Sequence, residues 1–165
     1  MKRVKMAVAV VAFFAILFAA NTGKAQVYTN AIGLRLGYPL SVSYKHFLNE
    51  NGAIEVFGGF RSFSGYGWFN VGGLYQHHKP ISGVDGLQWY FGGGASVFFW
   101  NYDNDFLDAD TNTSFGIMGN IGLDYKFADT PISVTADWAP VFFINGFGSG
   151  FGGGYGALGV RYVLK

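Results

Sequence analysis

Cysteine is absent from the 165-residue chain, and charged residues make up only 13% of it. Without cysteine there is no disulfide, no thiolate metal site, no cysteine nucleophile and no N-terminal cysteine to carry a lipid. Beyond the N-terminal region, no apolar run approaches the roughly 20 residues that a membrane-spanning helix needs. These absences leave non-thiol chemistry and a fold that hides its apolar residues in some other pattern.

The one long apolar run lies at the N-terminus. Three of the first five residues are basic, Met6–Ala20 is apolar throughout, and small residues follow at Gly23 and Ala25. This order predicts a cleaved secretory signal over residues 1–25 and a mature domain over 26–165. An uncleaved membrane anchor is the alternative, but fifteen residues are short for a span.

Cleavage changes the charge of the chain. It removes four basic residues, Lys2, Arg3, Lys5 and Lys24, and leaves seven basic against ten acidic residues, a formal charge of 7 − 10 = −3. A mildly acidic domain argues against nucleic acid as a partner.

What the chain has in quantity is glycine and aromatic side chains: 26 Gly, 18 Phe, 10 Tyr and 4 Trp. Half of all residues are nonetheless apolar. Apolar content that is spread through alternating strands, and not gathered in long runs, is typical of a transmembrane barrel.

The stretch Ser114–Phe127 shows the alternation most clearly. Every second residue is apolar or glycine: Phe115, Ile117, Gly119, Ile121, Leu123, Tyr125 and Phe127. The residues between them are mostly polar or small: Ser114, Gly116, Met118, Asn120, Gly122, Asp124 and Lys126. A period of two sends alternate side chains to opposite faces of a strand, so one face is apolar and the other must meet water or ion pairs.

The same alternation recurs along the mature chain in eight runs. They are Tyr28–Tyr38, Leu40–Leu48, Ala53–Phe63, Trp68–His78, Leu87–Trp100, Ser114–Phe127, Ile132–Ile144 and Gly154–Lys165. An even number of strands joined by short connections closes without an edge, as the hydrocarbon core of a membrane demands. The sequence therefore predicts an all-β, eight-stranded antiparallel up-and-down transmembrane β-barrel. A soluble barrel of lipocalin type is the rival, with a polar outside and an apolar lumen.

Several stretches resemble the small eight-stranded outer-membrane barrels of the OmpX-like and OmpW-like type and the Gly-rich "outer membrane protein beta-barrel" families. They are Gly33–Pro39, Ser43–Phe47, Gly122–Phe127 and Gly159–Tyr162. The resemblance implies the outer membrane of a diderm bacterium, reached by secretion to the periplasm. It also implies outer-membrane lipid and the barrel-assembly machinery as partners. It says little about activity, because such families mix structural, adhesive and transport members.

Alternation also places charged side chains inside the predicted barrel. They are Arg35, Lys45, Glu55, Arg61, Asp124, Lys126, Asp137 and Arg161. An eight-stranded barrel has an interior just wide enough for side chains to fill. We therefore expect a structural salt-bridge network; a selective channel is the alternative.

The longest polar connection, Asn101–Thr113, carries Asp103, Asp105, Asp108 and Asp110. Carboxylate oxygens suit hard cations, but the segment lacks the glycine and the closing glutamate of a calcium-binding hand. These residues are weak candidates for a metal site, and a solvated external loop is the simpler interpretation.

Two further patterns point away from enzymatic chemistry. The only histidines, His46, His77 and His78, fall near predicted periplasmic strand ends, where interfacial or turn positions explain them better than a lipid-modifying site. Gly154–Gly159 matches a dinucleotide-binding pattern, but that motif needs a following helix and a strand follows here. We expect no catalytic residue and no cofactor.

The function predicted from the sequence is an integral outer-membrane barrel with a structural or surface-interaction role and a lumen plugged by side chains. The alternative is a narrow transport barrel for small or apolar solutes.

Overall fold

The computed structural model describes residues 28–63, 66–101, 112–146 and 150–164, and the regular elements in these ranges are all β-strands. They are β1 (Asn30–Tyr38), β2 (Leu40–Phe47), β3 (Gly52–Phe63), β4 (Tyr66–Pro80), β5 (Leu87–Asn101), β6 (Asn112–Lys126), β7 (Ile132–Trp138), β8 (Val141–Phe143), β9 (Gly150–Gly152) and β10 (Gly156–Leu164). Within these ranges, no helix is long and apolar enough to cross a membrane.

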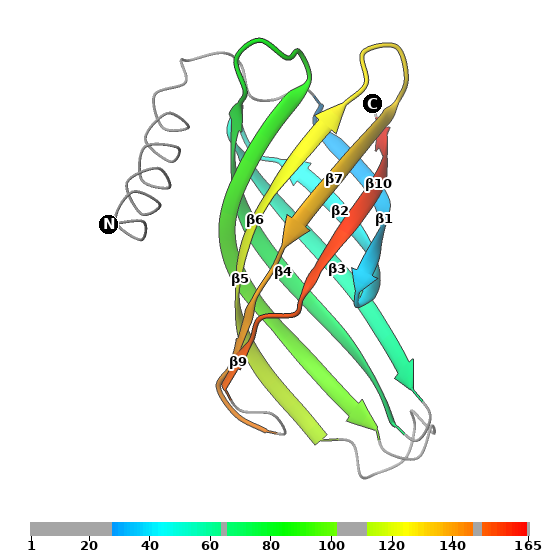
Figure 1. Ribbon diagram of the computed structural model, residues 1–165, viewed down its shortest axis with the longest axis vertical. Coiled ribbons are helices and arrows are strands. Elements are labelled where there is room, and N and C mark those ends of the chain that lie inside the picture. The colour runs from blue at the N-terminus through cyan, green and yellow to red at the C-terminus, as the bar shows by residue number, and fades with distance from the viewer. Residues whose placement is uncertain (1–27, 64–65, 102–111, 147–149, 165) are drawn as a thin grey trace, which may run out of the picture.

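Antiparallel pairing closes the strands into a barrel (Figure 1). Consecutive strands pair from β1 to β6, then β6 pairs with β7 and β8, and β10 returns to pair with both β7 and β1. The C-terminal end of β10 lies at the same end of the barrel as the turns after β2, β4 and β6, which we call the turn end; the opposite end is the far end (Figure 1). The predicted fold, a closed eight-stranded antiparallel barrel, is confirmed once β7 with β8, and β9 with β10, are each counted as one stave.

Two of the predicted runs differ in detail from the strands. The run Ile132–Ile144 is interrupted after Trp138 and resumes at Val141, because Pro140 has no N–H to donate to the ladder. Both pieces keep one register against β6. The last run was predicted as Gly154–Lys165, but its stave already begins with β9.

A β-bulge separates β9 from β10. Trp138 pairs with Gly156, and Val141 pairs with Gly152. The two pairings are three residues apart on the β7–β8 strand but four residues apart on the β9–β10 strand. One extra residue on one strand is the definition of a bulge. It exchanges the two faces of the strand: the outward residues of β10 are even-numbered, whereas the outward residue of β9 is Phe151, which is 69% exposed.

The barrel is apolar outside and polar inside. On β6 the outward Ile117 is 56% exposed, whereas the inward Asn120 and Asp124 are buried. Other strands repeat this, with exposed Leu34, Val42, Val56, Val71 and Val160. This polarity is the reverse of a lipocalin-type barrel and matches a barrel with lipid around it.

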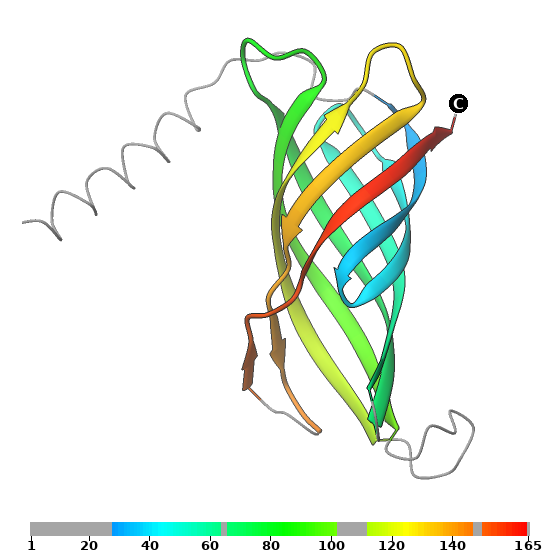
Figure 2. The ribbon, with the colours of Figure 1, turned by 45° about the vertical axis from the view of Figure 1, so that its right-hand side comes forward.

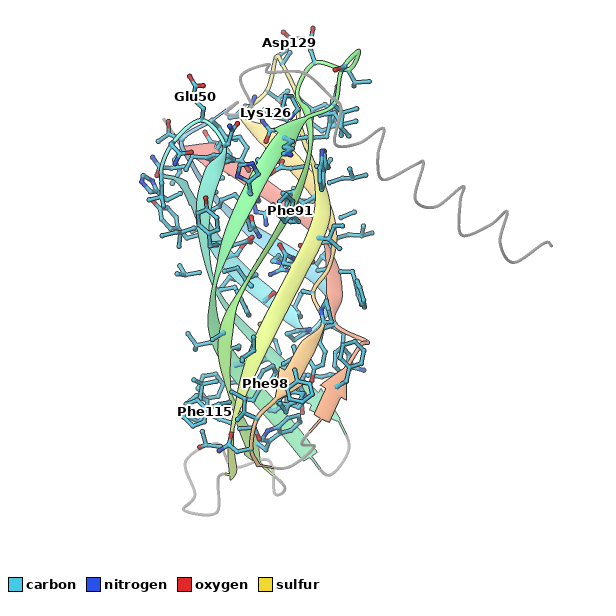
Figure 3. All side chains as sticks on the ribbon, turned by 90° about the vertical axis from the view of Figure 1, so that its left-hand side faces the viewer. Glu50, Phe91, Phe98, Phe115, Lys126 and Asp129 are labelled. Atoms are coloured by element: carbon cyan, nitrogen blue, oxygen red, sulfur yellow. The ribbon has the colours of Figure 1, made fainter. Side chains whose placement is uncertain are left out.

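Exposed aromatic side chains gather at both ends of the barrel. Tyr44, Tyr75 and Tyr162 lie on the outer surface toward the turn end, and Phe69 and Phe115 toward the far end. Figure 3 shows the two ends, with Glu50, Lys126 and Asp129 at one and Phe98 and Phe115 at the other. Aromatic girdles at two levels are typical of barrels that cross a membrane.

The wall of the barrel is uneven in height. β1 and β2 have nine and eight residues, whereas β4, β5 and β6 have fifteen each. The turn between β1 and β2 at Pro39 therefore ends partway along the barrel, and β3 to β6 continue beyond it (Figure 2). A membrane-spanning strand needs about 9–11 residues, so the short side matches a span and the long side projects past it.

Candidate functional site in the barrel lumen

The half of the lumen nearer the turn end contains buried ions, and we call it the ionic half. Its charged members are Arg35, Lys45, Glu55, Asp124, Asp137 and Arg161. Three cations therefore face three carboxylates, and all six side chains are at least 95% buried. Because isolated buried charges are strongly unfavourable, pairing is what permits them here.

The ion pairs cross the lumen between strands far apart in sequence. Arg161 Nη2 lies 2.5 Å from Glu55 Oε1, and Arg35 Nη2 lies 2.7 Å from Asp137 Oδ1. Lys45 Nζ is 3.3 Å from Asp124 Oδ2, and Arg161 Nη1 is 3.9 Å from the same oxygen. Arg161 thus links two carboxylates on opposite walls.

Neutral donors complete the shell of Asp124. The Tyr28 hydroxyl donates to Oδ2 at 2.6 Å, and the Ser133 hydroxyl donates to Oδ1. Tyr28 precedes β1, and burial, reinforced by the Asp124 carboxylate, raises the pKa of its phenol well above the usual value. The phenol therefore stays protonated and keeps donating.

The other two carboxylates are shared in the same way. Gln76 Nε2 donates to Glu55 Oε2 at 2.7 Å and to Asn120 Oδ1 at 2.8 Å. The Tyr90 hydroxyl donates to Asp137 Oδ2 at 3.0 Å. Every carboxylate of the ionic half thus has at least one ionic and one neutral partner.

The position of His78 differs from the prediction that all three histidines lie at interfaces or turns. It is fully buried in the ionic half, 4.8 Å from the Tyr90 ring centroid. Its Nδ1 lies 2.9 Å from Gln88 Oε1, which can only accept, so Nδ1 carries a proton. Its Nε2 lies 3.4 Å from Gln76 Oε1 and 3.5 Å from Lys45 Nζ.

Two residues predicted for the charge network lie outside the set of ion pairs above. Lys126, at the end of β6, donates through Nζ to the carbonyls of Phe127 and Thr130, and so closes the β6–β7 turn. The alternation predicted an inward side chain at Lys126, but the residue lies at the end of the strand, beyond the lumen. Arg61 lies toward the far end, with its guanidinium carbon 4.1 Å from the centroid of the Tyr38 ring.

The half of the lumen nearer the far end is packed with rings, and we call it the aromatic half. Its members are Tyr38, Phe57, Trp68, Phe98, Trp100, Phe143 and Tyr155. Trp68 and Phe98 are fully buried with ring centroids 5.3 Å apart, and Phe98 lies edge-on to Phe143 at 4.9 Å. Such offset and edge-to-face contacts are the favourable geometries for aromatic pairs.

The two halves meet with almost no space between them. Arg35 of the ionic half lies 5.5 Å from the Phe57 ring centroid, and a cavity of only about 10 Å³ separates Arg35 from Asn70 and Met118. That volume is at the lower limit for a single water molecule. The described side chains are therefore closely packed at this level of the lumen.

The remaining candidate residues do not form a site in the described part of the chain. Asp103, Asp105, Asp108 and Asp110, and the predicted signal over residues 1–25, lie outside the described residues. No group of three or more metal-ligating side chains occurs within the described ranges.

Two lumen residues, Gln76 and His78, were not predicted to join the network, although the alternation on β4 indicated that they face inward. His78 and Gln76 share the inward alternation of Asn70 on β4. Tyr28 gave less warning, because it begins the first predicted run but precedes β1 in the structure.

The hydroxyl and imidazole groups of the ionic half already have hydrogen-bond partners. Ser133 donates its proton to a carboxylate that already has two cationic neighbours, Lys45 and Arg161, so its oxygen is not prepared as a nucleophile. Both ring nitrogens of His78 already have partners, Gln88 at Nδ1 and Gln76 and Lys45 at Nε2. What the groups do is bind one another across the lumen.

No protein-family model and no curated protein sequence matches the chain. Among solved structures, it is similar to the crystal structure of Neisserial surface protein A (NspA), with a TM-score of 0.62 and 15% sequence identity over 82% of this chain and 93% of that one. At this identity the likeness concerns the fold. The fold is that of a small eight-stranded outer-membrane barrel, as the sequence resemblance predicted.

Proposed function

We propose that this protein is an integral outer-membrane protein of a diderm bacterium, with a structural or surface-interaction role, no enzymatic activity and a lumen closed by its own side chains. The observation that carries the proposal is the reversed polarity of the barrel: an apolar outer surface around a neutral set of buried ion pairs. Such a surface is stable against lipid and unstable against water.

The location has further support from the fold. The similar barrel of known structure, Neisserial surface protein A, is by its name a surface protein. In the proposed arrangement, residues 1–25 direct secretion to the periplasm, the assembly machinery inserts the barrel, and the turn end faces the periplasm. The long wall and the segment 101–113 then face outward, where barrel loops are longer.

Insertion is tested with a pair of arginine substitutions on the outer surface. Ile121 lies on the outward face of β6, and Leu48 lies outward at the turn after β2. Ile121→Arg should reduce the free energy of unfolding in lipid by about 2–4 kcal/mol, and Leu48→Arg by about 0–1 kcal/mol, because the cost of a cation depends on membrane depth. Equal effects, or a wild-type protein that stays soluble without detergent, would contradict a membrane barrel.

Closure of the lumen is tested by planar-bilayer recording of the purified protein. The packed rings and the neutral ion pairs predict no steady conductance. Steady conductance whose ion selectivity changes in Asp137→Asn would favour the alternative, a narrow transport barrel. Protease added to intact cells tests orientation, since it should cut between residues 101 and 113 and leave the strands protected.

A further inference from the structure

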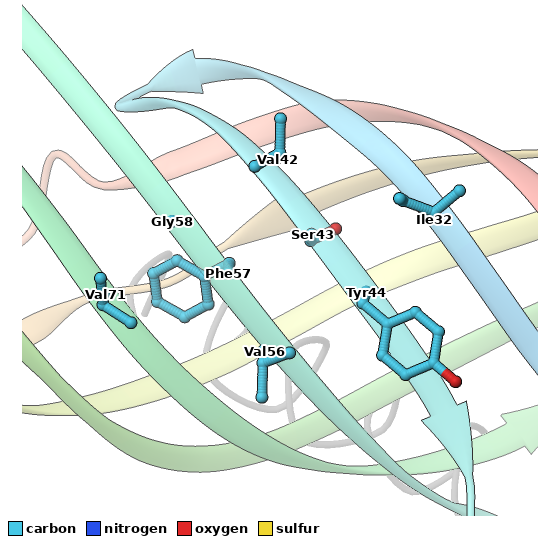
Figure 4. A pocket seen from close by; sticks show the side chains of 8 residues that line it. All are labelled: Ile32, Val42, Ser43, Tyr44, Val56, Phe57, Gly58 and Val71. Atoms are coloured by element: carbon cyan, nitrogen blue, oxygen red, sulfur yellow. The ribbon is translucent and has the colours of Figure 1, made fainter.

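The outer surface of the barrel has a hollow where one side chain is missing. Gly58 faces outward on β3, and its outward neighbours are Val42 on β2 and Val71 on β4. Around it lies a shallow, open hollow of about 290 Å³, lined mainly by Ile32, Val42, Tyr44, Val56 and Val71 (Figure 4). The lining crosses four adjacent strands, a distance of about 14 Å at the usual strand spacing.

A second hollow extends the first toward the turn end. It has a volume of about 420 Å³ and is lined by Tyr44, His46, Ile54 and Val56. Tyr44 and Val56 border both hollows, so the two adjoin, and together we call them the Gly58 groove. Among the described residues that line the two parts, there is no Asp, Glu, Lys or Arg.

The groove has a polar end and an apolar end. At the polar end the Tyr44 hydroxyl lies 2.8 Å from Asn30 Oδ1, and His46 Nδ1 lies 2.7 Å from the same oxygen. An amide oxygen only accepts, so both groups donate to it. This places a proton on His46 Nδ1, and the His46 side chain lines the groove beside Tyr44.

We propose that the Gly58 groove binds one phospholipid, with an acyl chain over Gly58 and the headgroup at Tyr44 and His46. An amphiphile with a long apolar chain and one polar end matches the groove in both parts, and the absence of a lining charge favours a zwitterionic headgroup over an anionic one. This inference rests on the proposed function, since the groove faces lipid only in a membrane. The polar end lies at the turn end, which is periplasmic in the proposed orientation, so a glycerophospholipid of that leaflet is the occupant.

Glycine positions provide a matched pair of variants. A side chain at Gly58 would fill the groove, and its Cβ would meet nothing nearer than the Asn70 carbonyl oxygen at 3.9 Å. Gly119 faces outward on β6, and a Cβ there would meet Pro140 Cγ at 3.6 Å, an ordinary contact. Gly58→Phe and Gly119→Phe therefore add the same apolar bulk to the outer surface with room for it, but only the first blocks the groove.

The test is native mass spectrometry of full-length barrels refolded in mild detergent and incubated with phosphatidylethanolamine. We expect one retained lipid on wild type and on Gly119→Phe, and at least a tenfold loss on Gly58→Phe. His46→Ala should weaken retention while the barrel stays folded. Equal retention by the two glycine variants, or retention of lipopolysaccharide in place of the phospholipid, would overturn the inference.

Failure of the groove and failure of the proposed function have different signatures. A wild-type barrel that shifts on heating in gel electrophoresis, as folded barrels do, but retains no lipid would overturn the groove alone. A protein that needs no detergent and shows no such shift would overturn the membrane assignment, and the groove with it.

Discussion

The ionic and aromatic halves of the lumen are held together by different interactions, ion pairs in the first and ring contacts in the second. In the ionic half each group depends on particular partners, because a buried charge is tolerable only while its counter-ion stays in place. In the aromatic half each ring contacts several others, so the loss of one removes contacts without leaving a charge behind. Damage to the first half should therefore depend on which partner remains, whereas damage to the second should scale with the volume removed.

The division follows the length of the strands. On β3 the inward Glu55 is followed by the inward Phe57, and on β5 the inward Tyr90 precedes the inward Phe98. The ions lie where the wall is complete on all sides, and most of the rings lie toward the end where β1 and β2 stop short (Figure 2). A ring loses little when water reaches its edge, whereas a buried ion pair is weakened by access to water.

The largest effect should come from separating a buried pair. Arg161→Met leaves Glu55 buried without its main counter-ion and should reduce the free energy of unfolding by about 3–5 kcal/mol. The double variant Glu55→Gln, Arg161→Met should recover most of that loss, because it removes both charges and keeps an acceptor for Gln76. Denaturant unfolding in detergent or lipid measures both.

The control for that rescue uses the wrong partner. Asp137→Asn combined with Arg161→Met removes equal charge but leaves Glu55 and Arg35 unmatched, so it should not recover stability. Equal recovery by the two combinations would mean that only the net charge of the lumen matters, and would contradict specific pairing.

In the aromatic half, Phe98→Ala should reduce the free energy of unfolding by about 3 kcal/mol, at the lower end of the usual range because water can enter from the far end. Adding Trp68→Ala should increase the loss further. Phe99→Ala, on the outward face beside Phe98, is the control and should have a smaller effect, since lipid fills the space. A double variant more stable than Phe98→Ala would show that rings, like ions, depend on single partners.

Two tyrosines offer a smaller and more direct comparison of the halves. Tyr28→Phe removes a hydrogen bond to the Asp124 carboxylate and should reduce stability by about 1.5–3 kcal/mol. Within the described part of the chain, Tyr155 contributes through its ring, so Tyr155→Phe should change stability by less than about 0.5 kcal/mol. Equal losses from the two variants would remove the distinction.

Salt should have the smallest effect of all. Because the ion pairs are at least 95% buried, raising sodium chloride from about 0.1 to 1 M should change the free energy of unfolding by less than about 0.5 kcal/mol. A loss above about 1 kcal/mol would show that water and ions already reach the ionic half, and would support the transport alternative.

The sequence predicts which face of a strand each lumen side chain occupies, but it does not predict how deep in the barrel that side chain lies. A period of two determines the face of each side chain, and Asp124, Glu55 and Arg161 lie inward as the alternation predicts. Depth along the barrel is not in the period: Lys126 shares the face of Asp124 but lies past the end of the lumen.

Partnership across the barrel was still harder to predict. Glu55 and Arg161 are 106 residues apart, and their contact depends on closure, tilt and the register of every strand between them. The broken seventh stave was partly foreseeable, since Pro140 is visible in the sequence. The bulge between β9 and β10 was not, because five glycines in that stretch leave few side chains to reveal a change of face.

The bulge between β9 and β10 changes which residues, odd-numbered or even-numbered, face outward. Upstream of it odd-numbered residues face lipid, and downstream even-numbered residues do. A single-residue deletion within Gly153–Tyr155 would remove the extra residue, so β9 and β10 could keep their pairings and Arg161 would stay inward. A deletion inside β10 would turn Arg161 out to the lipid and Val160 in to the carboxylates. Insertions and deletions in homologous barrels should therefore concentrate at this joint and avoid the strands on either side of it.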